Sequence, residues 1–282
     1  MRLGLRRSGV AVVLGLFTAC AAPDSNGPDG GGPSGNALAW SAPESWPGNH
    51  VPAAGDSVVI PAGATIKLDV SPPALHSLTI EGTLVFGNVD LALTSGWILV
   101  RGALKIGSEA NPFTKRALIT LTGTGAANDP SVDGMGNKML GVSGSVEIHG
   151  QRRGGWTRLR NTAVQGATQI SLVDNPGWKV GDRLALASSD YSQDKFEEAE
   201  ITGVSGTTLT LAAPLKYEHY GEIVSVSGTS VDERAEVGLL TRNITIQGDT
   251  GTTPGYGGHI IIMAGAVAHI EGVELFRMGQ RG

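Results

Sequence analysis

A charged stretch late in the chain holds residue types that could do chemistry. Residues 232–244 read DERAEVGLLTRNI and carry five charged side chains, although charged residues make up only 17% of the sequence. In a strand, residues two apart share a face, so Arg234 and Glu236 are predicted to project together. A planar guanidinium binds a carboxylate through two parallel hydrogen bonds. Arg234 is therefore a candidate catalytic or sugar-binding residue, with Glu236 orienting it.

A structural strand would show the same pattern. Ala235 and Val237 alternate with the charged positions and are predicted to point inward. A pair between Arg234 and either Glu236 or Asp182 would fix the junction at which an inserted module rejoins the rest of the fold. This interpretation is favoured and predicts that Arg234→Ala lowers the melting temperature by several degrees. The ligand-binding interpretation of Arg234 stays open beside it.

A second group of candidates surrounds Asp190 and Tyr191, with Glu198 close by in the sequence. An exposed tyrosine beside carboxylates can stack on a sugar ring, which makes these three residues candidate ligand contacts. Carboxylates in a loop can also hold calcium, but their spacing matches no EF-hand loop. A solvated hairpin edge protected by charge explains the same residues without any ligand.

The third candidate is His259, considered together with His269 and Glu271. If successive coils of a repetitive fold stack these positions, their side chains would line one groove. The chain's six histidines are otherwise scattered, and a single cysteine offers no pair, so no metal site is predicted. No P-loop, Gly-x-Ser-x-Gly or His-Glu-x-x-His sequence is present, and no cofactor is expected.

Glycine is the compositional anomaly, with 42 residues among 282, accompanied by 14 prolines. A net charge of −5 gives no basic field for nucleic acid. Very short alternating strands separated by tight turns recur through the chain, for example at residues 57–60, 78–80 and 84–86, and no sustained helical period interrupts them. Such spacing favours an all-β fold, a right-handed parallel β-helix. Residues 198–204 and 207–211 are predicted to pair as a hairpin in a small inserted β-hairpin or barrel module.

The N-terminus carries a targeting signal. Three arginines precede a short apolar run that ends at Cys20, the pattern of a bacterial lipoprotein signal, with ordinary signal cleavage as the alternative. The following Pro-, Gly- and Asp-rich residues are expected to form a flexible tether. The chain is thus predicted to be held at the bacterial cell envelope by a lipid anchor alone, or else to be secreted.

Several ordered motifs resemble the G8 domain family. They include WPG at 46–48, GDSVVIP at 55–61, EIHG at 147–150 and WKVGD at 178–182, together with RAEVGLLTRNI at 234–244. The targeting signal, the strand pattern and the resemblance together predict five regions: a signal peptide at 1–19, a linker at 20–36, a G8 domain at 37–160, a small β module at 161–242, and the first rungs of a truncated β-helix at 243–282. This last region suggests a fragment of a longer protein.

The resemblance also implies two functions. The first is a surface module that binds an extracellular polysaccharide or glycan. The second is a hyaluronidase-like enzyme that degrades polysaccharide by hydrolysis or elimination. Hyaluronan-degrading members of the family carry an extra domain before the WKVGD motif, and this chain lacks it. The sequence therefore favours binding and leaves the degrading enzyme, or a non-catalytic fragment of one, as the alternative.

Overall fold

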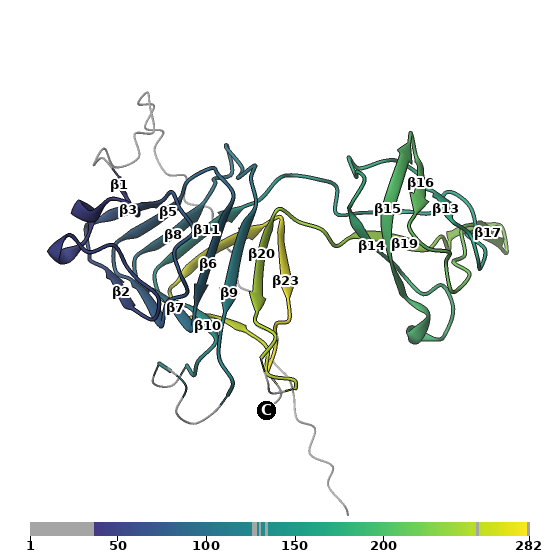
Figure 1. The fold of residues 1–282 in the computed structure, drawn as a ribbon. Coiled ribbons are helices and arrows are strands. Elements are labelled where there is room, and N and C mark those ends of the chain that lie inside the picture. The colour runs from purple at the N-terminus through teal and green to yellow at the C-terminus, as the bar shows by residue number, and fades with distance from the viewer. Residues whose placement is uncertain (1–36, 126–128, 130, 133–134, 252–253, 281–282) are drawn as a thin grey trace, which may run out of the picture. The chain divides into compact units, whose positions relative to one another are not determined.

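The computed structural model describes residues 37–125, 129, 131–132, 135–251 and 254–280. The expected signal peptide, Cys20 and the tether lie outside these residues. The described residues contain no α-helix, only the short 3-10 turns η1 (Pro43–Ser45), η2 (Pro47–Asn49) and η3 (Gln193–Lys195). Among them no helix has the length and apolar character needed to cross a membrane. The fold is all-β, as predicted (Figure 1).

Three parallel sheets form a β-helix, and the chain visits the second, the first and the third sheet in turn. The first sheet contains β1 (Leu38–Ala39), β3 (Thr65–Leu68), β5 (Thr83–Phe86), β8 (Ala103–Ile106), β11 (Ser145–His149) and β22 (Val267–Glu271). The second contains β2 (Ser57–Ile60), β4 (Ser77–Ile80), β7 (Trp97–Val100), β10 (Met139–Val142) and β21 (His259–Ile262). The third contains β6 (Leu91–Ser95), β9 (Ala117–Leu121), β20 (Ile244–Gly248) and β23 (Val273–Phe276).

Stacked inward side chains stabilise the β-helix. In the first sheet Ile66, Leu84, Leu104 and Val146 lie in register, and none of them is more than 1% exposed. Each such aliphatic side chain contributes about 1.5–3 kcal/mol through the apolar surface that it removes from water. The alternation that predicted short strands therefore identifies the interior of the coil.

Glycine occupies one corner of three successive coils, at Gly82, Gly102 and Gly144, between the second and the first sheet. A Cβ added to Gly102 would lie 1.9 Å from the carbonyl oxygen of Gly82, and one added to Gly144 would lie 2.1 Å from that of Gly102. Because no side chain fits at such separations, the coils can stack this closely only with glycine at the corner.

A separate antiparallel sheet is inserted between β11 and β20. Its order is β12 (Trp156–Arg158), β19 (Glu236–Leu239), β14 (Arg183–Leu186), β15 (Glu197–Ser205), β16 (Thr208–Leu211) and β13 (Gln169–Ser171). A bridge between Leu159 and Leu172 joins the two outer strands and curls the sheet on itself. The predicted hairpin is confirmed as β15 and β16.

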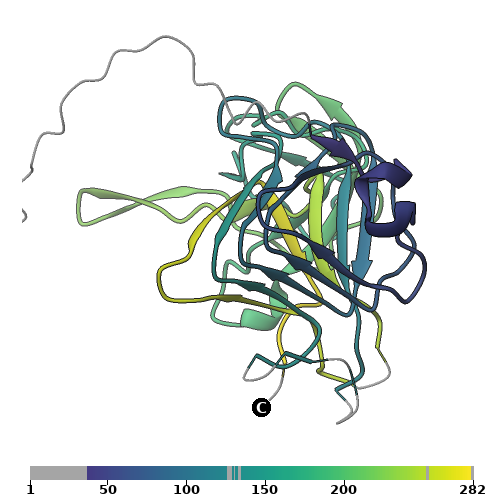
Figure 2. The same ribbon diagram turned by 90° about the vertical axis from the view of Figure 1, so that its left-hand side faces the viewer.

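The inserted sheet has its own apolar interior, which includes Leu184, Leu186, Ile201 and Val237. A two-stranded hairpin, β17 (Ile223–Val226) with β18 (Thr229–Asp232), projects from the sheet with mostly exposed side chains (Figure 2). Residues 156–242 therefore form a small β module with a core of its own.

Candidate functional site

The charged stretch follows β18 and leads into β19. Ala235 is 6% exposed and Val237 is fully buried, as their alternation predicted. Arg234 donates from Nε and Nη2 to the two carboxylate oxygens of Asp232, both at 2.8 Å. The predicted pairing of Arg234 with Glu236 or Asp182 is wrong, because a carboxylate two residues earlier in the chain lies within reach.

Both predicted partners of Arg234 are held by other arginines. Asp182 is 1% exposed and forms an ion pair with Arg153. Glu236 lies directly opposite Arg158 in the pairing of β12 with β19. Its Oε1 is 3.4 Å from Nη2 of Arg158. The Arg158 guanidinium also reaches Asp232. Hydrogen bonds from Arg234, and then from Arg158, lower the pKa of Asp232 well below its ordinary range, against the effect of desolvation.

An exposed tryptophan lies beside this cluster. Trp156 is 59% exposed, whereas Trp40, Trp46 and Trp178 are at most 7% exposed. The Arg158 guanidinium lies 5.7 Å from the centre of the indole ring. Because Thr157 is the buried residue of β12, its neighbour Trp156 faces outward.

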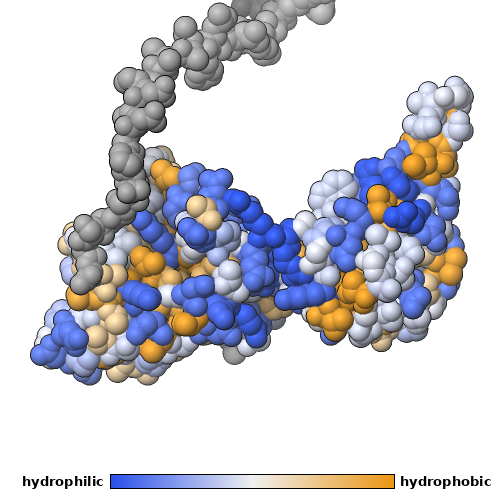
Figure 3. Space-filling model, turned by 90° about the horizontal axis from the view of Figure 1, so that it is seen from above, coloured by the Kyte–Doolittle hydropathy of each residue, from blue (hydrophilic) through white to orange (hydrophobic). Residues whose placement is uncertain are grey.

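The Trp156 pocket has a volume of about 270 Å³. It is lined by Trp156, Thr157, Arg158, Val173, Asp174 and Arg234. The Asp174 carboxylate accepts a hydrogen bond from the Thr157 hydroxyl, and this bond fixes the carboxylate beside the indole. An aromatic face surrounded by guanidinium donors and a carboxylate acceptor can stack on a sugar ring and hydrogen-bond its hydroxyls. Figure 3 shows charged and apolar residues side by side on this module.

The second group of candidates is only partly brought together. Asp190 lines a cavity of about 540 Å³, and its carboxylate forms an ion pair with Lys195. The hydrogen bond from Lys195 is the main cause of a lowered pKa at Asp190. Tyr191 is fully exposed, and Glu198 pairs instead with Arg183 at 3.2 Å. No group of three or more His, Cys, Asp or Glu side chains among the described residues is arranged to hold a metal ion.

The third candidate contains a real ladder, but His259 is not part of it. Glu147 and His149 on β11 lie in register with His269 and Glu271 on β22. Glu147 lies 3.0 Å from Nε2 of His149 and 2.8 Å from Nδ1 of His269. The bond from His149, followed by that from His269, lowers the pKa of Glu147 despite partial desolvation.

His259 belongs to another sheet and has another partner. It lies on β21 of the second sheet, and its Nε2 is 3.1 Å from the carbonyl oxygen of Met135. The predicted grouping of His259 with His269 and Glu271 is therefore wrong. Positions on different sheets of one coil face different directions, and the sequence spacing alone did not reveal which sheet each residue joins.

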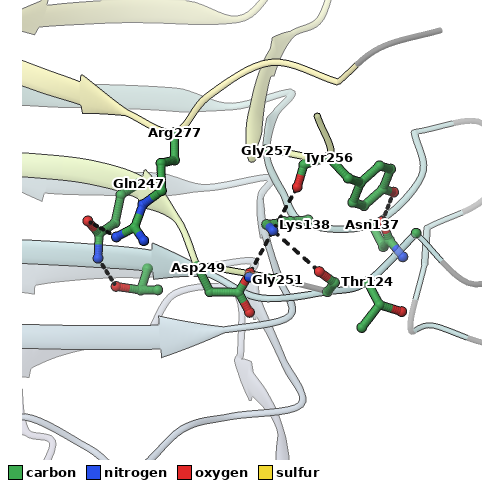
Figure 4. A network of polar contacts seen from close by, with 12 residues as sticks. Thr124, Asn137, Lys138, Gln247, Asp249, Gly251, Tyr256, Gly257 and Arg277 are labelled. Carbon is green, nitrogen blue, oxygen red and sulfur yellow. Dashed lines mark hydrogen bonds and ion pairs between the residues drawn. The ribbon is translucent and has the colours of Figure 1, made fainter. Parts of the chain in front are cut away.

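A buried lysine that the sequence did not single out links two loops of the β-helix. Lys138 is fully buried, and its Nζ lies 2.6 Å from Asp249 and 2.9 Å from the carbonyl oxygen of Tyr256 (Figure 4). The Tyr256 hydroxyl donates to Asn137 in the same network. All three Lys138 contacts in Figure 4 are to protein oxygens, so this ammonium acts as a structural cross-link rather than as a ligand contact.

Comparisons with known proteins agree with this architecture. The G8 domain model matches residues 45–160. Fibrocystin-L of Homo sapiens is 42% identical over 220 residues, which cover 74% of this chain and 5% of that protein. A G8 domain-containing protein of Dictyostelium discoideum is 30% identical, with 86% of this chain and 22% of that protein covered. The chain thus spans only a small part of these relatives.

One solved structure shows a distant likeness. The Gp54 tailspike of Acinetobacter baumannii bacteriophage AP22, in complex with A. baumannii capsular saccharide, matches with a TM-score of 0.27 and 12% identity. The match covers 71% of this chain and 30% of the tailspike chain. A likeness this low adds nothing to the description of the fold or the site.

Proposed function

This chain belongs to the G8 domain family, and from that premise and the Trp156 pocket we propose that it binds extracellular carbohydrate. The observation that carries the proposal is the exposed indole of Trp156, in a pocket that Arg158 and Arg234 also line. Large aromatic side chains are usually buried, and exposing one keeps apolar surface in contact with water. A sugar ring stacked on the indole would remove that surface from water.

The charges around the indole favour a particular mode of recognition. Arg158 pairs with Asp232 and Glu236, and Arg234 pairs with Asp232, so the two positive charges are compensated by two carboxylates. The pocket therefore offers directed donors and acceptors rather than a free cationic field. The hydroxyl groups of a sugar can accept hydrogen bonds from the guanidinium groups and donate hydrogen bonds to the Asp174 carboxylate. This supports a glycan ligand bound by stacking and hydrogen bonds.

The proposal extends to the location of the protein. A lipid on Cys20 and the following polar residues would hold the module at the bacterial cell envelope and leave it free to meet extracellular polysaccharide. Mass spectrometry of the mature protein tests this part: a diacylglyceryl-modified Cys20 at the N-terminus is expected, and an unmodified N-terminus at Ala21 or beyond contradicts the anchor.

A glycan array with the purified protein tests the binding function. The protein is expected to retain a restricted set of polysaccharides, and Trp156→Ala is expected to lose them. The matched control is Phe196→Ala, which removes an aromatic side chain of the same module with nearly equal exposure, 58% against 59%. Size-exclusion chromatography of hyaluronan after incubation separates binding from degradation. Failure to retain any glycan contradicts the proposal.

A further inference from the structure

A cavity on the inserted module lies beside two tyrosines of a short connecting segment. It has a volume of about 540 Å³. Its lining comes from four segments: the connection between β12 and β13, the loop between β14 and β15, the connection between β16 and β17, and the residue after β18. These lining residues are Gln165, Ser189, Asp190, Lys195, Lys216, Tyr217, Glu218, Tyr220 and Glu233. Tyr217 and Tyr220 are both half-buried, so each side chain packs partly against the module and is partly open to the cavity.

A buried carboxylate fixes the backbone of the segment that carries these tyrosines. Glu197 is 7% exposed and accepts the backbone N–H of Lys216 at 2.8 Å and that of Tyr217 at 3.0 Å. It also lies 3.0 Å from Nε2 of His219, which is fully buried. Three contacts to one carboxylate therefore set the conformation of residues 216–219.

The hydrogen bonds of His219 fix the position of its ring. Nδ1 lies 2.8 Å from the carbonyl oxygen of Ala187, which can only accept, so Nδ1 donates. Nε2 contacts Glu197, so the buried imidazole bridges Ala187 and that carboxylate. Burial alone would raise the pKa of Glu197, but the bonds from Lys216, His219 and Tyr217 outweigh it and lower that pKa.

Burying a carboxylate beside an imidazole is a costly way to stabilise a small barrel, because both polar groups lose their hydration. Its distinctive effect here is positional. With residues 216–219 tied inward, Tyr217 and Tyr220 are held ready at the cavity, which reduces the entropy that a ligand would otherwise lose on binding them. The interior of the module thus supports a preformed site.

The lining indicates the class of ligand. Two ammonium groups, Lys195 and Lys216, face three carboxylates, Asp190, Glu218 and Glu233, so neither sign dominates. The cavity offers both donors and acceptors beside the tyrosines, as a polyhydroxylated molecule requires and a phosphate or polyanion does not. We propose that this cavity is a second saccharide site for a neutral sugar unit, with Glu197 and His219 as positioning residues. It is separate from the Trp156 pocket and does not depend on it.

Isothermal titration calorimetry of the whole chain tests the proposal. The probes are maltotetraose, cellotetraose and chitotetraose as neutral ligands and tetragalacturonate as the acidic one. With Trp156→Ala as the starting protein, at least one neutral probe is expected to bind at one site. Adding Tyr220→Ala is expected to weaken that binding by about tenfold or more, whereas adding Phe196→Ala leaves it unchanged.

The positioning role has its own readout. Glu197→Gln keeps an acceptor for the backbone amides but loses the contact between the carboxylate and His219. It is expected to weaken binding of the neutral probe at the cavity while leaving the fluorescence response of Trp156 to its own ligand unchanged. Equal weakening at both sites would mean a merely structural role and would overturn the positioning role.

The outcomes separate the two proposals. If Trp156→Ala abolishes all binding seen with the wild type, the cavity proposal is wrong and the Trp156 pocket stands. If the variant binds a neutral probe and Tyr220→Ala has no effect, the cavity proposal is also wrong. Tighter binding of tetragalacturonate than of every neutral probe at the cavity contradicts the ligand class. Binding that survives Trp156→Ala and falls with Tyr220→Ala confirms the cavity.

Discussion

Arg158 lies directly opposite Glu236 across β12 and β19, and its guanidinium also forms an ion pair with Asp232. Asp232 therefore has two arginine partners, Arg158 and Arg234. Removal of either arginine leaves the carboxylate paired. This shared carboxylate changes what is expected of the charged stretch.

Arg234→Ala is expected to affect binding more than stability. The Arg234 and Asp232 side chains are near the surface and only two residues apart, so their pair contributes little to the free energy of unfolding. The melting temperature should fall by no more than about 2–4 °C. Glycan affinity at the Trp156 pocket should fall because a lining donor is lost. A larger thermal shift with unchanged affinity would restore the structural interpretation.

Gly102→Ala is expected to disrupt the β-helix. Its Cβ would lie 1.9 Å from a backbone oxygen of Gly82, which belongs to the neighbouring coil and cannot move alone. The free energy of unfolding should fall by about 3 kcal/mol or more, measured by chemical denaturation. Gly238→Ala is the control, since its Cβ would approach nothing closer than 3.9 Å. Equal stability of the two variants would refute the close stacking of the coils.

Lys138→Met is expected to destabilise the chain by about 3 kcal/mol, because Asp249 would lose its buried partner. Lys115→Met removes an exposed ammonium that forms no ion pair with the described residues and should change the free energy of unfolding by less than about 0.5 kcal/mol. Urea denaturation of both variants provides the comparison. Similar losses in the two would show that the Lys138 cross-link is not stabilising.

The contacts of the Glu197 carboxylate predict a dependence of stability on acid. The pKa of Glu197 in the folded chain is below its ordinary value of 4.5, so ionised Glu197 stabilises the fold above that value. This contribution is lost as the pH falls through 4.5 towards the folded-state pKa. When the pH is lowered from about 6 to about 3, the melting temperature of the wild type should fall by more than that of Glu197→Gln. Parallel curves would show that the carboxylate is not stabilised by its contacts.

Much of the fold could be predicted because one local pattern repeats. Short alternating strands and regular glycines predicted parallel coils, and the inward columns such as Ile66 and Leu84 confirm them. The hairpin at β15 and β16 was predictable because its turn is short and local. These features depend on residues close together in the sequence.

Less of the candidate site could be predicted, because it depends on register between distant strands. Arg158 and Glu236 are opposite only through the pairing of β12 with β19. Tyr217 and Tyr220 could not be predicted as site residues, because their segment is held in place by Glu197, which is distant in the sequence. A signal was nevertheless present in the sequence, since residues 216–220, KYEHY, alternate charge with aromatic rings and contain little that would build a core.

The most direct test of carbohydrate binding at Trp156 is calorimetry with the strongest ligand from the glycan array. Wild type, Trp156→Ala and Phe196→Ala would be titrated side by side, with circular dichroism to verify equal folding. The account predicts that Trp156→Ala weakens binding at this site by at least about tenfold while Phe196→Ala matches the wild type. Undiminished affinity in a folded Trp156→Ala protein would contradict it.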